Sequence, residues 1–349
     1  MAAGKPKVVA ISSPKWAGED YLKEFEKKFE VHVVTPGDRK TTIKNLADKV
    51  KSDGPFDAIL ILMGIGAYEP FDEEILKPLT PHLKIMGSAS AGYNEFDVDW
   101  MTRNGILFCN SRNAVNDATA DMAILMILSI LRDVQGRASS IAKGTWRGMT
   151  NGVLVPTKDP SGMKLGIIGM GAVGKHVARK AKCFGMKVIY YQRTRLEPED
   201  EAAYDATYCS SLDELLSEAD IISPHFPLNE KTKGMLSHEQ FAKMKDGVFL
   251  INTCRGPVID EDALIKALES GKVTRAGLDV FHNEPNINPY FIRNDRVMIQ
   301  PHMGGLTDVS WQRSYREAME NVRSFFETGK AISPVNADKI QRLAQGAAL

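Results

Sequence analysis

A glycine pattern in the middle of the chain constrains the fold most. Gly169, Gly171 and Gly174 form G-x-G-x-x-G directly after the apolar run 164–168, and a helical pattern begins near Ala172. A buried strand, a tight turn and a helix in this order form the phosphate-binding turn of a doubly wound α/β domain, in which backbone N–H groups approach a pyrophosphate closely. The same spacing also occurs in packing glycines, but the strand before it and the helix after it favour a nucleotide site.

Short apolar runs alternate with amphipathic stretches, which indicates parallel α/β structure. The runs that we expect to be strands are 7–11, 31–34, 56–62, 83–86, 164–168, 187–191, 220–223, 248–252, 275–280 and 296–300. Two long helical patterns, 117–132 and 308–327, bracket the second series. We expect two doubly wound parallel-sheet domains, a Rossmann-type cofactor domain (119–318) inserted into a discontinuous flavodoxin-like substrate domain (1–118 plus 319–349).

The composition excludes several classes of partner. Lys plus Arg and Asp plus Glu both number 44 in 349 residues, so no basic excess attracts nucleic acid or an anionic membrane. The most apolar stretch, 122–131, is too short to span a bilayer, and the N-terminus lacks a signal-peptide core. Four cysteines without C-x-x-C spacing indicate reduced thiols and no metal site. We expect a cytoplasmic protein whose partners are small molecules or copies of itself.

Three ionisable residues follow three of the later apolar runs. Arg255 comes after 248–252, Glu284 after 275–280 and His302 after 296–300. In an open parallel sheet these strand ends share one edge, where ligands bind. A guanidinium can hold a carboxylate and polarise the adjacent carbonyl, while an imidazole oriented by a carboxylate can give or take a proton. These residue types predict hydride transfer between a nicotinamide cofactor and a 2-hydroxy acid or 2-oxo acid, with the trio as the catalytic residues.

The residues after the next strand leave the choice of cofactor open. An acid that would bind the 2′-hydroxyl of NAD is expected about twenty residues beyond the glycines, but Gln192 stands there. Arg193 and Arg195 follow, and either guanidinium could bind the 2′-phosphate of NADP. Alternatively, both are solvated and Gln192 bonds the ribose. The residues therefore permit NADP.

Five segments resemble successive signatures of the D-isomer-specific 2-hydroxyacid dehydrogenases. They are 166–174, 225–232, 252–256, 277–285 and 301–305, and the resemblance extends over almost the whole chain. Within that family the chain is most similar to the fungal D-mandelate dehydrogenases, with glyoxylate/hydroxypyruvate reductases as neighbours. The resemblance implies NAD as the cofactor, a D product, and a homodimer formed through an arm at 132–165.

The resemblance also implies contacts for the two ligands. The cofactor residues are Gly169, Gly171, Ala172, Val173, Gly174, Gln192, Arg193, Thr194, Phe226, Pro227, Thr232, Thr253, Cys254, Arg255 and Asp279. The substrate residues that it implies are Ala91, Gly92, Arg255 and His302, and Trp311 is added to them for its position in the sequence. Asp279 could alternatively stabilise a turn and make no cofactor contact, because Asp at a strand end is commonly a turn residue.

The sequence constrains the 2-substituent of the substrate least. Four aromatic residues either line a pocket for a bulky group or belong to the core, namely Tyr68, Phe71, Tyr93 and Trp311. Trp311 favours the pocket because it follows His302 closely, so we expect an aromatic or bulky acid pair such as D-mandelate and benzoylformate. A glyoxylate/hydroxypyruvate reductase is the alternative. A nucleotide-sensing, corepressor-like binding protein is the alternative from another class, which the neutral charge and the absence of long disordered flanks disfavour.

Overall fold

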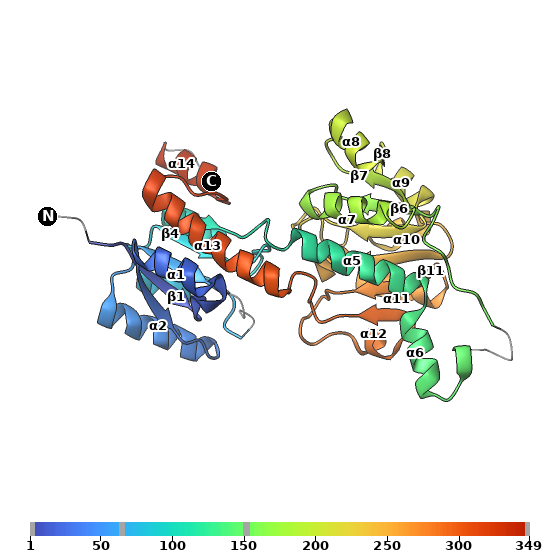
Figure 1. The fold of residues 1–349 in the computed structure, drawn as a ribbon, viewed down its shortest axis with the longest axis horizontal. Helices are drawn as coiled ribbons and strands as arrows, with labels where there is room; N and C mark the ends of the chain where they lie inside the picture. The colour runs from blue at the N-terminus through green and yellow to red at the C-terminus, as the bar shows by residue number, and fades with distance from the viewer. Residues whose placement is uncertain (1–3, 63–66, 149–153, 346–349) are drawn as a thin grey trace. The chain divides into compact units, whose positions relative to one another are not determined.

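The computed structural model describes residues 4–62, 67–148 and 154–345. The chain forms two compact units, one of residues 1–115 and 306–349 and one of residues 116–305. The boundaries differ from the expected 118/119 and 318/319, and the second differs most. All of helix α13 (Asp308–Thr328) packs with the first unit, against β3, β4 and η1, so the chain returns to that unit before this helix begins (Figure 1).

The first unit contains a five-stranded parallel sheet in the order β2-β1-β3-β4-β5. This is the expected flavodoxin-like order. Its elements are β1 (Lys7–Ile11), η1 (Pro14–Ala17), α1 (Glu19–Glu26), β2 (Glu30–Val34), α2 (Arg39–Asp53), β3 (Ala58–Ile61), α3 (Glu73–Leu76), η2 (Lys77–Leu79), β4 (Ile85–Ser88), α4 (Val98–Arg103), β5 (Leu107–Cys109), α13 and α14 (Ala337–Ala344). Helices cover both faces, and β1 and β3 are almost entirely buried, as strands inside a doubly wound sheet must be.

The second unit contains a seven-stranded parallel sheet in the order β12-β11-β10-β9-β6-β7-β8. Its elements are α5 (Asn116–Leu131), α6 (Val134–Ala142), η3 (Trp146–Gly148), β6 (Lys164–Ile168), α7 (Ala172–Lys182), β7 (Lys187–Tyr191), α8 (Pro198–Tyr204), β8 (Ala206–Tyr208), α9 (Leu212–Glu218), β9 (Ile221–Pro224), α10 (His238–Lys243), β10 (Val248–Asn252), η4 (Gly256–Val258), α11 (Glu261–Glu269), β11 (Val273–Leu278), α12 (Pro289–Arg293) and β12 (Val297–Ile299). The strand order reverses at β6, as in a Rossmann-type domain. The expected fold class is therefore confirmed.

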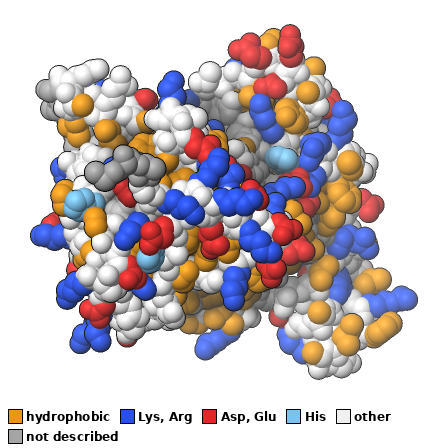
Figure 2. Space-filling model, turned by 60° about the vertical axis from the view of Figure 1, so that its left-hand side comes forward, with side chains coloured by type: hydrophobic (Ala, Val, Ile, Leu, Met, Phe, Trp, Pro, Cys, Tyr) orange, Lys and Arg blue, Asp and Glu red, His pale blue; other side chains and the backbone are white. Residues whose placement is uncertain are grey.

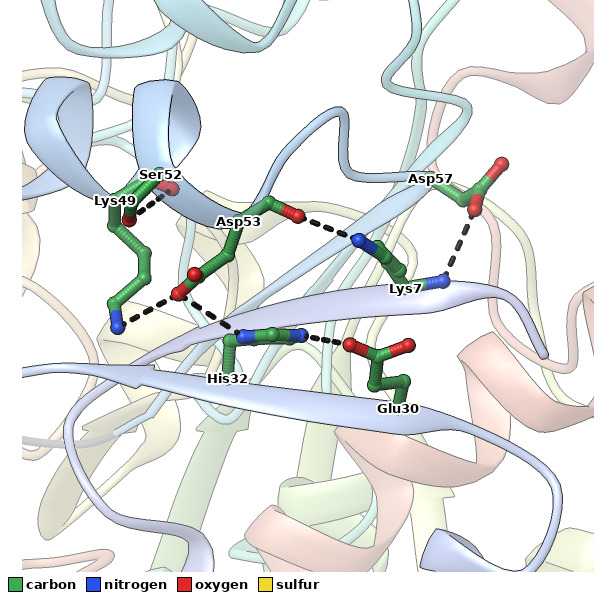
Figure 3. A network of polar contacts seen from close by, with 7 residues as sticks. All are labelled: Lys7, Glu30, His32, Lys49, Ser52, Asp53 and Asp57. Carbon is green, nitrogen blue, oxygen red and sulfur yellow. Dashed lines mark hydrogen bonds and ion pairs between the residues drawn. The ribbon is translucent and has the colours of Figure 1, made fainter. Parts of the chain in front are cut away.

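A polar network fixes the amino-terminal ends of β1 and β2 (Figure 3). The ring of His32 lies between two carboxylates, with Nε2 2.6 Å from Glu30 Oε1 and Nδ1 3.3 Å from Asp53 Oδ2. Lys49 pairs with the same Asp53 oxygen at 2.9 Å, and Lys7 Nζ donates to the Asp53 carbonyl at 2.7 Å. The network joins both strands to the end of α2 at the edge of the sheet opposite to its carboxyl ends.

The surface carries mixed charges. Figure 2 shows basic and acidic side chains intermingled over the face that it presents, as the balanced composition requires. Within the described ranges, no helix combines the length and the apolar character needed to cross a membrane.

Candidate active site

An imidazole and a carboxylate meet at the carboxyl ends of β11 and β12. His302 follows β12, and its Nδ1 lies 2.7 Å from Oε2 of Glu284, which follows β11. The other oxygen of Glu284 accepts a hydrogen bond from the backbone N–H of Phe281 at 2.8 Å, which fixes the carboxylate. Burial raises the pKa of Glu284, but the hydrogen bond and positive charge from His302 outweigh it and hold that pKa below its ordinary value. The side chain of His302 remains 45% exposed, so the ring is accessible to a ligand.

Arg255 lies beside this pair on the neighbouring strand. It follows β10, which is hydrogen-bonded to β11, and its Nη1 donates to the carbonyl of Cys254 at 2.7 Å. A Cβ on Gly256 would lie 2.0 Å from the carbonyl carbon of Phe281, so only glycine permits this approach of the loop after β10 to the loop that carries Glu284. The charge of Arg255 also contributes to the lowered pKa of Glu284. The structure thus brings the predicted trio together at one edge of one sheet.

Asp279 holds the loop that carries His302. It is 1% exposed, and its two carboxylate oxygens accept the backbone N–H groups of Met303 at 2.7 Å and Gly304 at 2.8 Å. The N–H of His302 donates to the Asp279 carbonyl at 2.8 Å. Burial raises the pKa of Asp279 against the opposing effect of the two N–H donors. These contacts fit the alternative interpretation of Asp279 as a residue that stabilises a turn.

Asn252 organises the loop that carries Arg255, and the sequence analysis did not single it out. Its Oδ1 accepts the N–H of Cys254 at 3.0 Å, and its Nδ2 donates to the carbonyl of Arg255 at 2.9 Å. The sequence offered one indication of this role. Asn252 is an amide residue at the end of an apolar run, and a buried polar side chain needs hydrogen-bond partners.

The glycine turn has the geometry that a pyrophosphate site requires. Gly169 directly follows β6 with φ 97°, and a Cβ there would lie 2.7 Å from the carbonyl oxygen of His225. A Cβ on Gly174 would lie 2.4 Å from the Gly169 carbonyl oxygen, whereas one on Gly171 would meet open space. In the described part of the chain no side chain caps the first turn of α7, so the N–H groups at Ala172 and Val173 retain capacity for an anion.

The two arginines after β7 have different surroundings. Arg195 makes two hydrogen bonds to Glu201, both 2.8 Å, and stacks over the ring of Tyr208. Arg193 is exposed, and no hydrogen bond or ion pair of its side chain appears in the described ranges. Gln192 accepts the N–H of Met170 and donates to the carbonyl of Thr194, so its amide joins the glycine turn to the loop after β7. Of the two arginines, only Arg193 has an uncommitted guanidinium.

The remaining predicted cofactor residues follow β9 and β10. Thr253 is 7% exposed, and its buried hydroxyl has no hydrogen-bond partner among the residues that the structure describes, which fits a ligand that supplies one. Burial raises the pKa of the neighbouring Cys254 thiol to about 11, so it is not a reactive thiolate. Phe226 packs against the core, Pro227 is exposed, and the Thr232 hydroxyl donates to the Pro227 carbonyl at 2.7 Å.

Ala91 and Gly92 lie in the first unit, after β4. Asn110 donates to the carbonyl of Ala91 at 2.6 Å, and the Ser90 hydroxyl donates to the carbonyl of Gly92 at 2.9 Å. These bonds hold the carbonyls toward the protein, and no described hydrogen bond uses the N–H of Ala91 or Gly92. Ser90 and Asn110 were not predicted as supports of this loop.

The four aromatic candidates for a substrate pocket separate into core and partly exposed residues. Tyr68 and Phe71 are 1% and 0% exposed and belong to the core of the first unit. Tyr93 is 41% exposed. Trp311 is partly buried between Trp16 and Tyr315, with ring centroids 5.9 and 6.3 Å away. Its buried indole N–H has no hydrogen-bond partner within residues 4–62, 67–148 and 154–345.

No group of three or more His, Cys, Asp or Glu side chains in the described ranges could hold a metal ion. The doubly wound sheet, the glycine turn and the imidazole–carboxylate pair beside a guanidinium together define a nucleotide-dependent oxidoreductase.

Comparison with known proteins identifies the family. Residues 124–304 match the model of the D-isomer specific 2-hydroxyacid dehydrogenase, NAD binding domain. The dehydrogenase efuE of Hormonema carpetanum is 53% identical over 336 residues, which cover 96% of this chain and 83% of that protein. The chain belongs to the D-isomer specific 2-hydroxyacid dehydrogenase family, and it is an NAD(P)-dependent oxidoreductase.

Two solved structures show the same fold. A glyoxylate reductase from Paecilomyes thermophila has a TM-score of 0.85 and 35% identity, covering 96% of this chain and 100% of that one. The apo D-mandelate dehydrogenase of Rhodotorula graminis has a TM-score of 0.84 and 31% identity, covering 95% and 98%. Both similarities agree with the family that the sequence motifs resemble.

Proposed function

We propose that this enzyme interconverts a 2-oxo acid and its D-2-hydroxy acid with NAD(H), and that the substrate carries a bulky or aromatic substituent. The observation that carries the proposal is the 2.7 Å contact between His302 Nδ1 and Glu284, with Arg255 on the adjacent strand end. Such a pair supplies a proton donor and acceptor, and the guanidinium supplies a fixed charge for the acid group.

The trio divides the chemistry among three side chains. Bound NADH supplies the hydride for reduction of the carbonyl carbon. His302 donates a proton to the carbonyl oxygen, and in the oxidation direction it removes the hydroxyl proton. Glu284 orients the ring through Nδ1 and stabilises its protonated form, while Arg255 binds the substrate carboxylate and polarises the carbonyl. The N–H groups of Ala91 and Gly92 also bind the carboxylate.

The glycine turn and the strand ends hold the cofactor in this proposal. Ala172 and Val173 bind the pyrophosphate through their N–H groups, and the loop 192–194 contacts the adenosine ribose. Phe226, Pro227 and Thr232 line the nucleotide. Thr253 and Cys254 lie at the nicotinamide ribose, where the unpartnered hydroxyl of Thr253 gains a bond, and Asp279 lies at the carboxamide.

An apolar cavity beside the catalytic pair supports the bulky substituent. It has a volume of about 400 Å³ and is lined by Phe281, Glu284, Pro285, Ile287, Ile299, Gln300, Pro301 and His302. The structural similarity to D-mandelate dehydrogenase supports benzoylformate as a substrate. The similarity to a glyoxylate reductase supports the second candidate, a glyoxylate/hydroxypyruvate reductase.

A substrate panel tests the proposal. Purified enzyme is assayed with NADH and benzoylformate, phenylpyruvate, glyoxylate or hydroxypyruvate, and we expect the highest kcat/KM with the two aromatic acids. His302→Ala should lower kcat by about 10²–10⁴-fold, the usual contribution of a general acid or base, with NADH binding retained. A larger kcat/KM with glyoxylate would select the second candidate, and absence of turnover with every acid would refute both.

Trp311→Ala tests a separate contact of the substituent, because Trp311 does not line this cavity. The side chain has one uncommitted donor and lies against Trp16, so we propose that it contacts the substituent. Its removal should lower kcat/KM for benzoylformate more than that for glyoxylate. An unchanged ratio would assign Trp311 to the core alone.

We also propose a cytoplasmic homodimer formed through the arm 132–165. Large apolar side chains of the arm are exposed, namely Val134, Ile141, Trp146, Leu154 and Val155. Such a concentration of exposed apolar groups is typical of a protein interface. Residues 149–153 of the arm lie outside the described residues.

A further inference from the structure

The first unit contains a second cavity with a different chemical character. It has a volume of about 520 Å³ and is formed by the segment after β5 and by one side of α13. Its lining consists of Arg112, Asn113, Arg313, Arg316, Glu317, Glu320, Asn321, Ile332 and Ser333. We call it the α13 cavity. All of these residues belong to the first unit, and none is a member of the proposed catalytic machinery.

Two of the arginines around the α13 cavity interact electrostatically with Glu317, because their charges oppose the rise of its pKa on burial. The side chains of Arg112 and Arg313 are exposed, and neither makes a hydrogen bond or ion pair within the described ranges. Arg316 is held differently, because its Nε donates to the Ala17 carbonyl at 2.7 Å and its guanidinium stacks over the ring of Tyr21. The cavity is therefore bordered by one fixed and two adaptable guanidinium groups.

The two carboxylates of the cavity have partners of their own. Glu320 accepts the hydroxyl hydrogen of Tyr21 and pairs with Arg323 at 2.9 Å. Oε2 of Glu317 accepts the N–H of Asn113 at 3.3 Å, and burial raises the pKa of Glu317 above its ordinary value.

The charges around the cavity do not balance. Three guanidinium groups line the cavity, those of Arg112, Arg313 and Arg316, against two carboxylates. Arg323 is not part of the lining, but it pairs with one of these carboxylates, that of Glu320. The surplus positive charge in a cavity of ligand size favours an anion.

We propose that the α13 cavity binds a small polyvalent oxyanion, either a phosphorylated compound or a polycarboxylate. Arg112 and Arg313 grip its oxygens through forked N–H pairs, and Arg316 supplies a fixed third donor. Arg112 lies three residues before the chain leaves the first unit, after Val115, and Arg313 lies in the second turn of the helix that begins after the chain returns at Leu306. A ligand that bridges them therefore ties together the two segments through which this unit continues into the other.

Calorimetric titration of the full chain tests the proposal. The enzyme is saturated with NADH, so that the glycine turn is filled, and is then titrated with pyrophosphate, with citrate and with monovalent acetate as a control. We expect one equivalent of pyrophosphate or citrate to bind and acetate not to bind. Tighter binding of pyrophosphate assigns a phosphorylated ligand, and tighter binding of citrate assigns a polycarboxylate.

Variants assign the binding to this cavity. The double variant Arg112→Gln/Arg313→Gln should weaken it at least tenfold, a loss of about 1.4 kcal/mol or more. Arg342→Gln, a change at an exposed arginine of α14, should leave it unchanged, as should Arg255→Gln in the proposed active site. Thermal melting checks that the double variant is folded. Equal affinity in the folded double variant, loss of binding in Arg255→Gln alone, or no binding of either polyvalent anion by the unaltered enzyme would overturn the proposal.

Discussion

We expect the contact between Glu284 and His302 to contribute to the rate of the proposed reaction. Replacing Glu284 with Gln keeps the shape of the side chain and removes the charge that strengthens its hydrogen bond to the ring. A hydrogen bond to a charged group contributes about 1.5–3 kcal/mol, and we take the lower end because solvent screens partly exposed groups. The side chains of His302 and Glu284 are 45% and 35% exposed. At about 1.4 kcal/mol per factor of ten, the expected loss of kcat/KM is about tenfold.

The loss should be equal in the two directions, because a substitution in an enzyme does not change the equilibrium constant of the reaction. We therefore expect kcat/KM of Glu284→Gln to fall about tenfold both for reduction of the 2-oxo acid and for oxidation of the D-2-hydroxy acid. Steady-state assays run in both directions measure the loss.

A matched variant separates this effect from a general loss of charge. Glu269→Gln removes an exposed carboxylate at the end of α11 and should leave kcat/KM unchanged in both directions. The binding of NADH, measured by fluorescence, should be the same in all three proteins. A kcat/KM of Glu284→Gln equal to that of the unaltered enzyme would refute the assignment of Glu284 as the partner of the proposed catalytic imidazole.

Three further predictions concern other parts of the second unit. Burial lowers the pKa of His225 from 6.5 to about 4. The stability that its neutral form contributes is therefore full above about pH 6.5 and is lost as the pH falls toward 4. In urea unfolding, the free energy of unfolding should differ less between pH 7 and pH 5 in His225→Gln than in the unaltered protein. Arg193→Ser should lower the ratio of kcat/KM for NADPH over NADH about tenfold, because a charge-assisted contact contributes about 1.5 kcal/mol or more. Arg195→Ser should leave this ratio nearly unchanged. Equal effects of both changes would contradict the assignment of the 2′-phosphate contact to Arg193. Ile141→Lys should shift the protein from dimer to monomer in light scattering, because Ile141 is 65% exposed on the arm, and an unchanged mass would remove the arm from the interface.

The sequence predicts the interior strands of both sheets and two of the four edge strands, β2 and β12. The run 7–11 is β1 and the run 164–168 is β6, because continuous apolar residues are required where both faces of a strand are covered. The edge strands β5 and β8 were not predicted. Each has three residues, which are too few to show a period.

The spacings Ser211 to Glu214 and Ser237 to Gln240 predict a capping box at the start of two helices. The box at Ser237 is present, with the Gln240 side chain accepting the Ser237 N–H. At Ser211 the expected reciprocal bond is displaced by one residue, because the Glu214 carboxylate accepts the N–H of Ser210 instead. The spacing specifies which residue types can cap a helix, but the backbone before the helix decides which N–H group the side chain reaches.

The catalytic trio could be proposed from sequence because the topology determines where strand ends meet. Once 248–252, 275–280 and 296–300 are taken as neighbouring parallel strands, the residues after them must share an edge, whatever their separation in the chain. The contacts that hold them could not be derived in this way. Whether an Asp after a strand faces a ligand or its own loop depends on loop backbone angles, and the buried Asp279 carboxylate uses both oxygens on the N–H groups of Met303 and Gly304. Loss of the Asp279 carboxylate should therefore displace His302 even with cofactor bound. Asp279→Asn should lower kcat as well as weaken nicotinamide binding. An effect on KM for the cofactor alone would show that the loop keeps its place without the carboxylate.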